Sequence, residues 1–216
     1  ASAAEPSIQT EPAPEQIAAV SPTDISAAAA KAMEIPAQTA TPITDENKSA
    51  ASANNLKSIE IDLARLDAFG MVTTLNPRSV IAEEYRVIKR PLLRNATGRG
   101  AAPVKQGNLI MVSSSMPGEG KSFSSINLAM SIAMEIDHRV LLVDADVSRP
   151  SVLNILGLPP AKGLMDVLLN DDLDLSDVML RTNIENLTLL PAGMANQRAT
   201  ELLASDSMTR LLSEMA

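Results

Sequence analysis

Three short apolar runs mark the second half of the chain, at residues 109–112, 140–143 and 186–190. The first two contain no polar side chain, and the third contains Asn186 and Thr188. Near-continuous apolar runs are typical of strands that are covered on both faces in a parallel sheet. The segment between the first two runs, residues 122–137, is apolar on almost all sides, so we expect a buried helix there. Strand, helix and strand in this order predict a right-handed βαβ unit.

Apolar residues at helical spacing predict further helices at residues 151–156, 163–169 and 199–215. Residues 78–90 form another predicted helix, which Pro91 is expected to end or kink. Upstream of it, residues 59–63 alternate like a short strand and lead into a helical turn that ends at Gly70. The fold class that follows is α/β, a parallel sheet flanked by helices.

The first 55 residues follow a different pattern. They contain six of the fourteen prolines and seven acidic residues, but only two lysines and no aromatic residue. Such a segment cannot bury enough apolar surface to offset its ordering entropy, so we expect a disordered tail. The chain then divides into a tail (1–56), a docking segment (57–107) that packs on its own domain or on another chain, and a main domain (108–216).

The composition excludes several classes of site. The chain has no cysteine, which excludes disulfides, thiolate-held iron–sulfur clusters and cysteine zinc sites. Its single histidine, His138, excludes a histidine metal site and is expected to be a solvated turn residue. A net charge of -8 argues against nucleic acid as the main partner. No apolar run approaches the roughly 20 residues that a membrane-spanning helix needs.

Candidate chemistry lies between the first apolar run and the helix after it, in the sequence MPGEGKS at residues 116–122. A glycine loop that leads into a helix N-terminus is a phosphate-binding arrangement, and the alternative is a chance surface turn. Gly118 and Gly120 let the backbone approach an oxyanion. Lys121 can reach the β- and γ-phosphates of a nucleotide, and the Ser122 hydroxyl can bind the accompanying Mg²⁺.

The pattern G-x-x-x-x-G-K-[ST] describes such loops, and Ser115 stands in the place of its first glycine. The flanking strand and helix that the motif requires are both predicted here, which favours the nucleotide interpretation. The residues expected to bind the nucleotide are Ser115, Met116, Pro117, Gly118, Glu119, Gly120, Lys121, Ser122 and Phe123.

Two carboxylates, Asp144 and Asp146, follow the second apolar run directly. Residues i and i+2 of an extended chain point the same way, and ligands bind at the carboxyl ends of strands in such folds. Two carboxylates beside a phosphate loop suit Mg²⁺ binding and activation of an attacking hydroxyl; the alternative is helix capping and turn formation. We therefore predict Lys121, Asp144 and Asp146 as catalytic, and Ser122 with the two aspartates as metal ligands.

Taken together, residues 81–93, 114–122 and 140–150 resemble the bacterial tyrosine kinases, P-loop enzymes of the MinD/ParA-like superclass. The resemblance covers about residues 57–216 and is greatest to the autokinases encoded with exosortase and exopolysaccharide systems. It implies a P-loop NTPase fold, ATP, Mg²⁺ and autophosphorylation on tyrosine. It also implies that residues 115–122 are the Walker A loop and that the two aspartates form a second, Walker A′ motif.

The resemblance gives the helix after residue 78 a role as an oligomerisation helix. The positions of the family's ring-contact motif are taken here by Glu83, Arg86 and Lys89, followed by Arg90. The family's Walker-B strand, its Mg²⁺-linked aspartate and its tyrosine cluster are expected beyond residue 216. The core is therefore expected to be incomplete, and the single tyrosine, Tyr85, is expected to be a packing residue.

The implied function is that of an ATP-dependent protein-tyrosine autokinase that regulates exopolysaccharide biosynthesis or export. The implied partners are ATP, further copies of the chain in a ring, and a separate membrane-bound polysaccharide chain-length or export protein as activator. The implied location is the cytoplasm, peripheral at the inner membrane.

Two alternatives remain open. One is a MinD/ParA-like positioning ATPase, although such proteins carry an additional lysine early in the P-loop that residues 115–117 lack. The other is a non-catalytic fragment that only binds nucleotide or docks to a partner. A tyrosine-rich C-terminal tail would favour the kinase, and a membrane-targeting amphipathic helix would favour the positioning ATPase.

Overall fold

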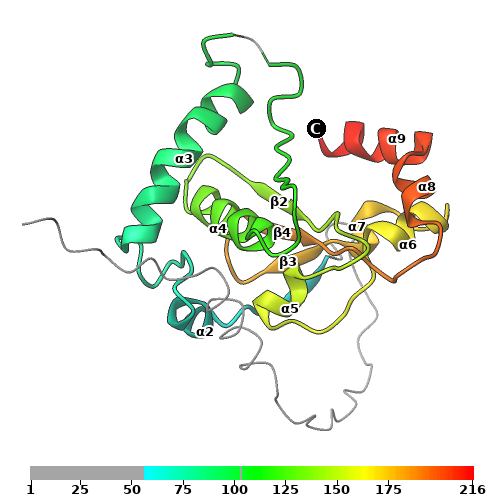
Figure 1. Cartoon of the computed structure of the whole chain (residues 1–216), viewed down its shortest axis with the longest axis horizontal. Coiled ribbons are helices and arrows are strands. Elements are labelled where there is room, and N and C mark those ends of the chain that lie inside the picture. Colours follow the sequence, from blue (N-terminus) through cyan, green and yellow to red (C-terminus); the bar gives the residue numbers. More distant parts are fainter. Residues whose placement is uncertain (1–55, 103) are drawn as a thin grey trace, which may run out of the picture. The chain divides into compact units, whose positions relative to one another are not determined.

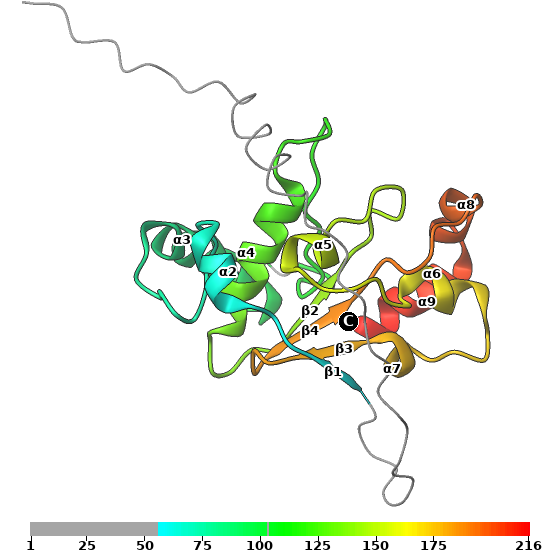
Figure 2. The same cartoon turned by 90° about the horizontal axis from the view of Figure 1, so that it is seen from below.

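The computed structural model describes residues 56–102 and 104–216, all of which belong to one compact unit. The expected tail therefore lies outside the described residues, except for Leu56. A four-stranded sheet forms the centre of this unit (Figure 1), with the strands in the order β1-β3-β4-β2 (Figure 2). The strands are β1 (Lys57–Ile59), β2 (Val140–Val143), β3 (Leu180–Thr182) and β4 (Leu187–Leu190).

Parallel pairs dominate this sheet, as Figure 2 shows from below. β1 runs parallel to β3, and β2 runs parallel to β4. β3 and β4 are antiparallel, with Leu180 opposite Leu189, because only residues 183–186 connect them. The α/β class is confirmed, and the β3–β4 hairpin is a feature that the apolar pattern did not reveal.

Helices flank the sheet, and most follow the predicted segments. They are α2 (Leu63–Ala68), α3 (Val80–Ala96), α4 (Lys121–Ala133), α5 (Val152–Leu156), α6 (Leu164–Leu169), α7 (Leu175–Val178), α8 (Ala199–Leu203) and α9 (Asp206–Met215). The single helix predicted at 199–215 is two helices, because the Ser205 side chain accepts a hydrogen bond from Met208 N and begins a new helix there. α7 was not predicted.

α3 continues through Pro91, so of the two expectations, an end or a kink at this proline, the end is wrong. A proline inside a helix removes one backbone hydrogen bond and costs about 3 kcal/mol. Pro91 and the residue one turn before it, Val87, both lie on the exposed side of α3, where water can solvate the freed carbonyl. Beyond the proline, Leu92 and Leu93 pack against the core, which offsets the loss.

Residues 109–112 form no strand, so the predicted βαβ unit lacks its first strand. Leu109 and Ile110 are exposed, and Met111 is 88% exposed. β2 is an edge strand with β4 on its one paired side, and no strand of the described chain pairs with residues 109–112. An apolar run predicts burial, but a strand also needs a neighbour that offers backbone hydrogen bonds.

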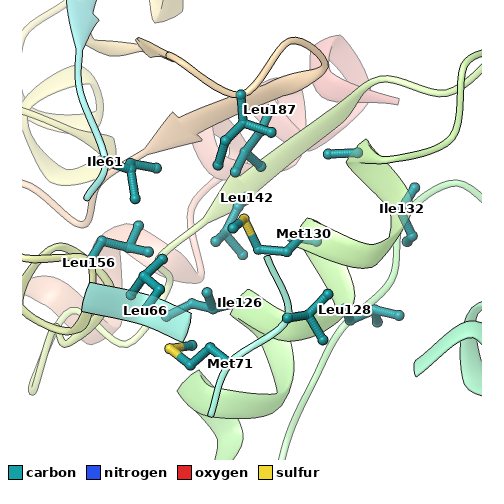
Figure 3. Close-up of a cluster of buried hydrophobic side chains, with 14 of the residues drawn as sticks. Ile61, Leu66, Met71, Ile126, Leu128, Met130, Ile132, Leu142, Leu156 and Leu187 are labelled. Carbon is teal, nitrogen blue, oxygen red and sulfur yellow. The ribbon is translucent and has the colours of Figure 1, made fainter. Parts of the chain in front are cut away.

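α4 forms the centre of the main hydrophobic core and contacts both β2 and β4. Every residue from 126 to 133 is buried. Figure 3 shows Ile126 and Met130 of α4 between Leu66 of the docking segment and Leu142 of the sheet. The docking segment and the main domain therefore share one core, so the docking segment packs on its own domain.

A second cluster joins the C-terminal helices to the sheet. Leu164 and Leu168 of α6, Leu175 of α7 and Met208 of α9 pack together with Leu190 of β4. Leu141 and Val143 of β2 pack against the same cluster. The cluster buries apolar side chains of short helices that would not be stable alone.

Two asparagines hold the docking segment by hydrogen bonds to its backbone. The fully buried Asn127 of α4 accepts a hydrogen bond from Val72 N at 2.7 Å and donates to Phe123 O at 2.9 Å. Asn183 accepts from Ile61 N at 2.9 Å and donates to Ile61 O at 3.0 Å. These bonds satisfy backbone groups that burial would otherwise leave without partners.

Replacing Asn127 by alanine should therefore destabilise the complete protein. The change leaves the buried Val72 N–H without its acceptor, which costs about 1–3 kcal/mol. We expect a lower midpoint in urea denaturation for Asn127→Ala, and a change below about 0.5 kcal/mol for Asn76→Ala at an exposed position. Equal midpoints for the two variants would contradict this account of the docking segment.

Candidate functional site

The glycine loop predicted at residues 115–122 runs into the first turn of α4, and both of its glycines adopt the left-handed backbone region. Gly118 has a φ of 86° and Gly120 a φ of 85°, a region that residues with a Cβ rarely adopt. A Cβ built at either position would meet no atom within 4 Å, so the loop is open on this side. Gly120 is also the N-cap of α4 and offers no side-chain cap, which leaves the first N–H groups of α4 for an anion.

Lys121 and Ser122 stand on the first turn of α4, directly after this loop. Both are partly buried, and Phe123 behind them is 39% exposed. The Ser122 hydroxyl lies 2.6 Å from the hydroxyl of Ser151 and is hydrogen-bonded to it. This contact brings together the end of the loop and the segment that leaves β2.

The carboxylate of Glu119 folds back over the loop. Its Oε2 accepts a hydrogen bond from Met116 N at 3.0 Å and a longer one from the Ser115 hydroxyl at 3.5 Å. The bond from Met116 N is the main reason why the pKa of Glu119 lies below its ordinary value, and the Ser114 and Ser115 hydroxyls lower it further. The loop's own carboxylate therefore occupies the N–H group of Met116, one of the residues predicted to bind the nucleotide.

Asp144 is buried and held firmly at the end of β2. Its backbone N–H donates to Leu190 O at 2.9 Å, which continues the pairing of β2 with β4. Its Oδ2 accepts from Ser151 N at 3.0 Å and from Val152 N at 3.1 Å. Its Oδ1 accepts from Asp146 N at 3.2 Å. The capping role considered for this aspartate is present, and it also connects Asp144 to Ser122 through Ser151.

Asp146 differs from Asp144 in its surroundings. It is exposed, and its Oδ1 accepts from Arg149 N at 3.1 Å across a tight turn. The two carboxylates therefore differ in how strongly they are held in place. Asp144 is fixed by three backbone N–H groups, whereas Asp146 faces solvent.

The oxygen donors at this site fit Mg²⁺, a hard cation that is usually held by one or two carboxylates, phosphate oxygens and water. Ser122 supplies a hydroxyl, and the Oδ1 of Asp144 keeps a lone pair beside its hydrogen bond from Asp146 N. Within residues 56–102 and 104–216, no group of three or more acidic, histidine or cysteine side chains could hold a metal by itself. A cation here would be shared with the phosphates of a nucleotide.

The four residues expected at an oligomer contact have different environments on α3. Glu83 and Arg86 form an ion pair one turn apart, and Arg86 also donates to Pro77 O at 3.2 Å. Glu83 and Arg90 are exposed. Lys89 is only 3% exposed, so its ammonium does not reach the surface where a second copy would bind.

Lys89 instead connects α3 to the C-terminal end of α4. Its Nζ donates to Ser131 O at 2.5 Å and forms a salt bridge with Glu135 at 2.6 Å. The hydrogen bond from Lys89 is the main cause that lowers the pKa of Glu135. The remaining surface residues, Glu83, Arg86 and Arg90, stay the predicted contact.

Sequence reasoning missed two residues of this region. Ser151 precedes a helix as many serines do, and no local signal distinguishes a hydroxyl that caps its own helix from one that reaches α4. Glu135 is one of several acidic residues near a helix end, and its pairing with Lys89 depends on the tertiary packing of α3 against α4. His138, expected to be solvated, is partly buried, and its Nδ1 has no hydrogen-bond partner among the described residues.

Comparison with known proteins gives a consistent family. Residues 107–215 match a family model described as AAA domain. Tyrosine-protein kinase YwqD of Bacillus subtilis (strain 168) is 31% identical over 144 residues, which are 67% of this chain and 57% of that protein. Succinoglycan biosynthesis transport protein ExoP of Rhizobium meliloti (strain 1021) is 30% identical over 139 residues, which are 63% of this chain and 17% of that protein.

A solved structure shows a similar fold. The crystal structure of the chimerical protein CapA2B2 has a TM-score of 0.55 and 28% sequence identity, and covers 74% of this chain and 64% of that chain. Several further curated relatives are also named tyrosine-protein kinases. The chain spans less than two thirds of the length of YwqD, of ExoP and of the CapA2B2 chimera. The chain belongs to the AAA domain family, and the relatives it resembles within that family include bacterial tyrosine-protein kinases.

Proposed function

We propose that the complete protein is an ATP-dependent protein-tyrosine autokinase that regulates the biosynthesis or export of an exopolysaccharide. The observation that carries this proposal is the hydrogen-bonded connection from Ser122 through Ser151 to Asp144, which joins a phosphate-type loop to a carboxylate at the end of β2. The names of the relatives support tyrosine as the acceptor and polysaccharide biosynthesis as the process. The reaction would transfer the γ-phosphoryl group of ATP to a tyrosine hydroxyl.

Each candidate residue has a role that its environment supports. The backbone N–H groups of residues 116–120 and the Lys121 ammonium would hold the phosphates of ATP. Ser122 would bind the Mg²⁺ ion, which supplies positive charge beside the β- and γ-phosphates. Asp144, already fixed by three N–H groups, would orient this end of the site. Asp146 faces solvent and would accept the proton of the incoming tyrosine hydroxyl.

The outer face of α3 supports assembly with further copies of the chain. Val80 is 77% exposed and Val87 is 71% exposed, and both lie among the charged residues Glu83, Arg86 and Arg90. Exposed apolar side chains among charged ones are typical of a protein contact surface. In the proposal this face forms the ring-like oligomer.

The activator would be a separate membrane-bound polysaccharide chain-length or export protein, and the kinase would act in the cytoplasm at the inner membrane. In the part of the chain that the structure describes, no helix is both long and apolar enough to cross a membrane. This finding is compatible with a membrane partner on another chain.

A second candidate function is a non-catalytic nucleotide-binding or docking module. The observation that favours it is the exposed segment 109–112, because no strand of the described chain holds the start of the loop. Hydrolysis of ATP by the complete protein, or phosphate transfer, would exclude it. A positioning ATPase would hydrolyse ATP without labelling tyrosine.

Replacing Lys121 by methionine in the complete protein should abolish autophosphorylation on tyrosine. The change keeps an unbranched side chain that is one heavy atom shorter, and it removes the charge that would hold the transferred phosphate. Phosphotyrosine would be measured by immunoblot after addition of Mg²⁺-ATP, with the exposed Lys162→Met as the control variant that keeps its signal. Undiminished phosphotyrosine in Lys121→Met would refute the assignment of the loop.

Replacing Glu119 by glutamine should strengthen the binding of ADP several-fold. The glutamine keeps the size of the side chain but removes a negative charge that faces the Met116 N–H group of the loop. Isothermal titration calorimetry at low and high salt would measure the difference, which should shrink at high salt because charge repulsion is screened. Glu201→Gln, an equal charge change on α8, is the control. Weaker ADP binding in Glu119→Gln would mean that the carboxylate supports the loop instead of competing with phosphate.

A further inference from the structure

Ser151 occupies the N-cap position of α5 without performing the usual capping role of a serine. A serine at this position normally accepts a hydrogen bond from the N–H of the second or third helical residue. The Ser151 side chain makes no such bond. The carboxylate of Asp144 satisfies the N–H groups at this end instead, because its Oδ2 accepts from both Ser151 N and Val152 N. The Ser151 hydroxyl is therefore free for another partner.

That partner is the hydroxyl of Ser122, 29 positions away in the sequence. The two oxygens are 2.6 Å apart, at the short end of the range for O–H···O hydrogen bonds. A serine inside a helix commonly donates to the carbonyl four residues before it, as Ser125 does to Lys121 O at 2.8 Å. Ser122 stands in the first turn and is paired across to Ser151 instead.

If Ser122 binds a cation, the chemistry of a hydroxyl ligand decides which of the two serines donates the hydrogen bond. A serine oxygen that binds a cation uses a lone pair, so its proton must point away from the cation toward an acceptor. Ser151 Oγ lies in the right place to accept that proton. Ser151 is itself held in position, since its backbone N–H is bonded to the buried carboxylate of Asp144.

We propose that Ser151 is a positioning residue of the nucleotide site, which accepts the proton of Ser122 and thereby turns a lone pair of Ser122 toward the Mg²⁺ ion that accompanies the nucleotide. The inference rests on the proposed function of the loop as a nucleotide site. It assigns Ser151 to the metal-dependent part of nucleotide binding, because the phosphate contacts of the loop and of Lys121 do not pass through Ser151.

The test measures ADP affinity of the complete protein twice, with Mg²⁺ and with EDTA, by isothermal titration calorimetry. The ratio of the two affinities is the gain from the metal. Removal of a group that orients a metal ligand typically costs about 10–100-fold in metal affinity, so Ser151→Ala should lose at least about tenfold of this gain. Its ADP affinity in EDTA should stay at the wild-type value.

Two further variants separate a positioning role from a structural one. Ser151→Thr keeps a hydroxyl and should restore the gain from the metal. Ser176→Ala, an equal change at an exposed position of α7, should behave as wild type. An unchanged gain in Ser151→Ala would overturn the proposal, and so would an equal loss of ADP affinity in EDTA, which would make Ser151 structural.

Failure of the proposed function would look different. If the wild-type protein bound no ADP under either condition, the loop would not be a nucleotide site, whatever the behaviour of Ser151→Ala. If the wild type bound ADP with a clear gain from Mg²⁺ and Ser151→Ala kept that gain, the proposed function would stand and the positioning role alone would fall.

Discussion

The burial of α4 is the constraint on which the rest of this structure depends. This helix begins at the glycine loop and is covered by the docking segment, which includes α3, and by the sheet. Apolar packing supplies most of the contact, while Asn127 and the salt bridge of Glu135 with Lys89 fix how its neighbours lie against it. Because the helix is held at many points, its first residues, Lys121 and Ser122, have a defined position relative to β2.

The same constraint explains how the two sequence motifs meet. β2 packs against α4, and its pairing with β4 continues to the backbone of Asp144. Asp144 then orders the backbone at the start of α5 through two hydrogen bonds, which places Ser151 beside Ser122. The candidate site is thus built from the carboxyl end of a strand and the N-terminus of a helix, the arrangement in which α/β folds bind ligands.

The sequence predicts well those elements whose burial follows from the spacing of apolar residues within the element itself. β2, β4, α5 and α6 match the predicted segments within one or two residues. Most failures share one cause, which is dependence on distant partners; the division of residues 199–215 into two helices is the exception, because Ser205 caps α9 locally. Residues 109–112 have the composition of a strand but no described neighbour. α3 passes through Pro91, and the partly buried Leu92 and Leu93 beyond it pack against the core; Lys89 is internal because Glu135 lies opposite.

The most direct test of the account is to incubate the purified complete protein with Mg²⁺-ATP and to identify the phosphorylated residues by mass spectrometry. The account predicts phosphate on tyrosine side chains of the protein itself, in amounts that increase with time and depend on Mg²⁺. Turnover of ATP without any phosphotyrosine would contradict the kinase and favour a positioning ATPase. If the protein neither turned over ATP nor labelled tyrosine, a non-catalytic module would remain as the function of this fold.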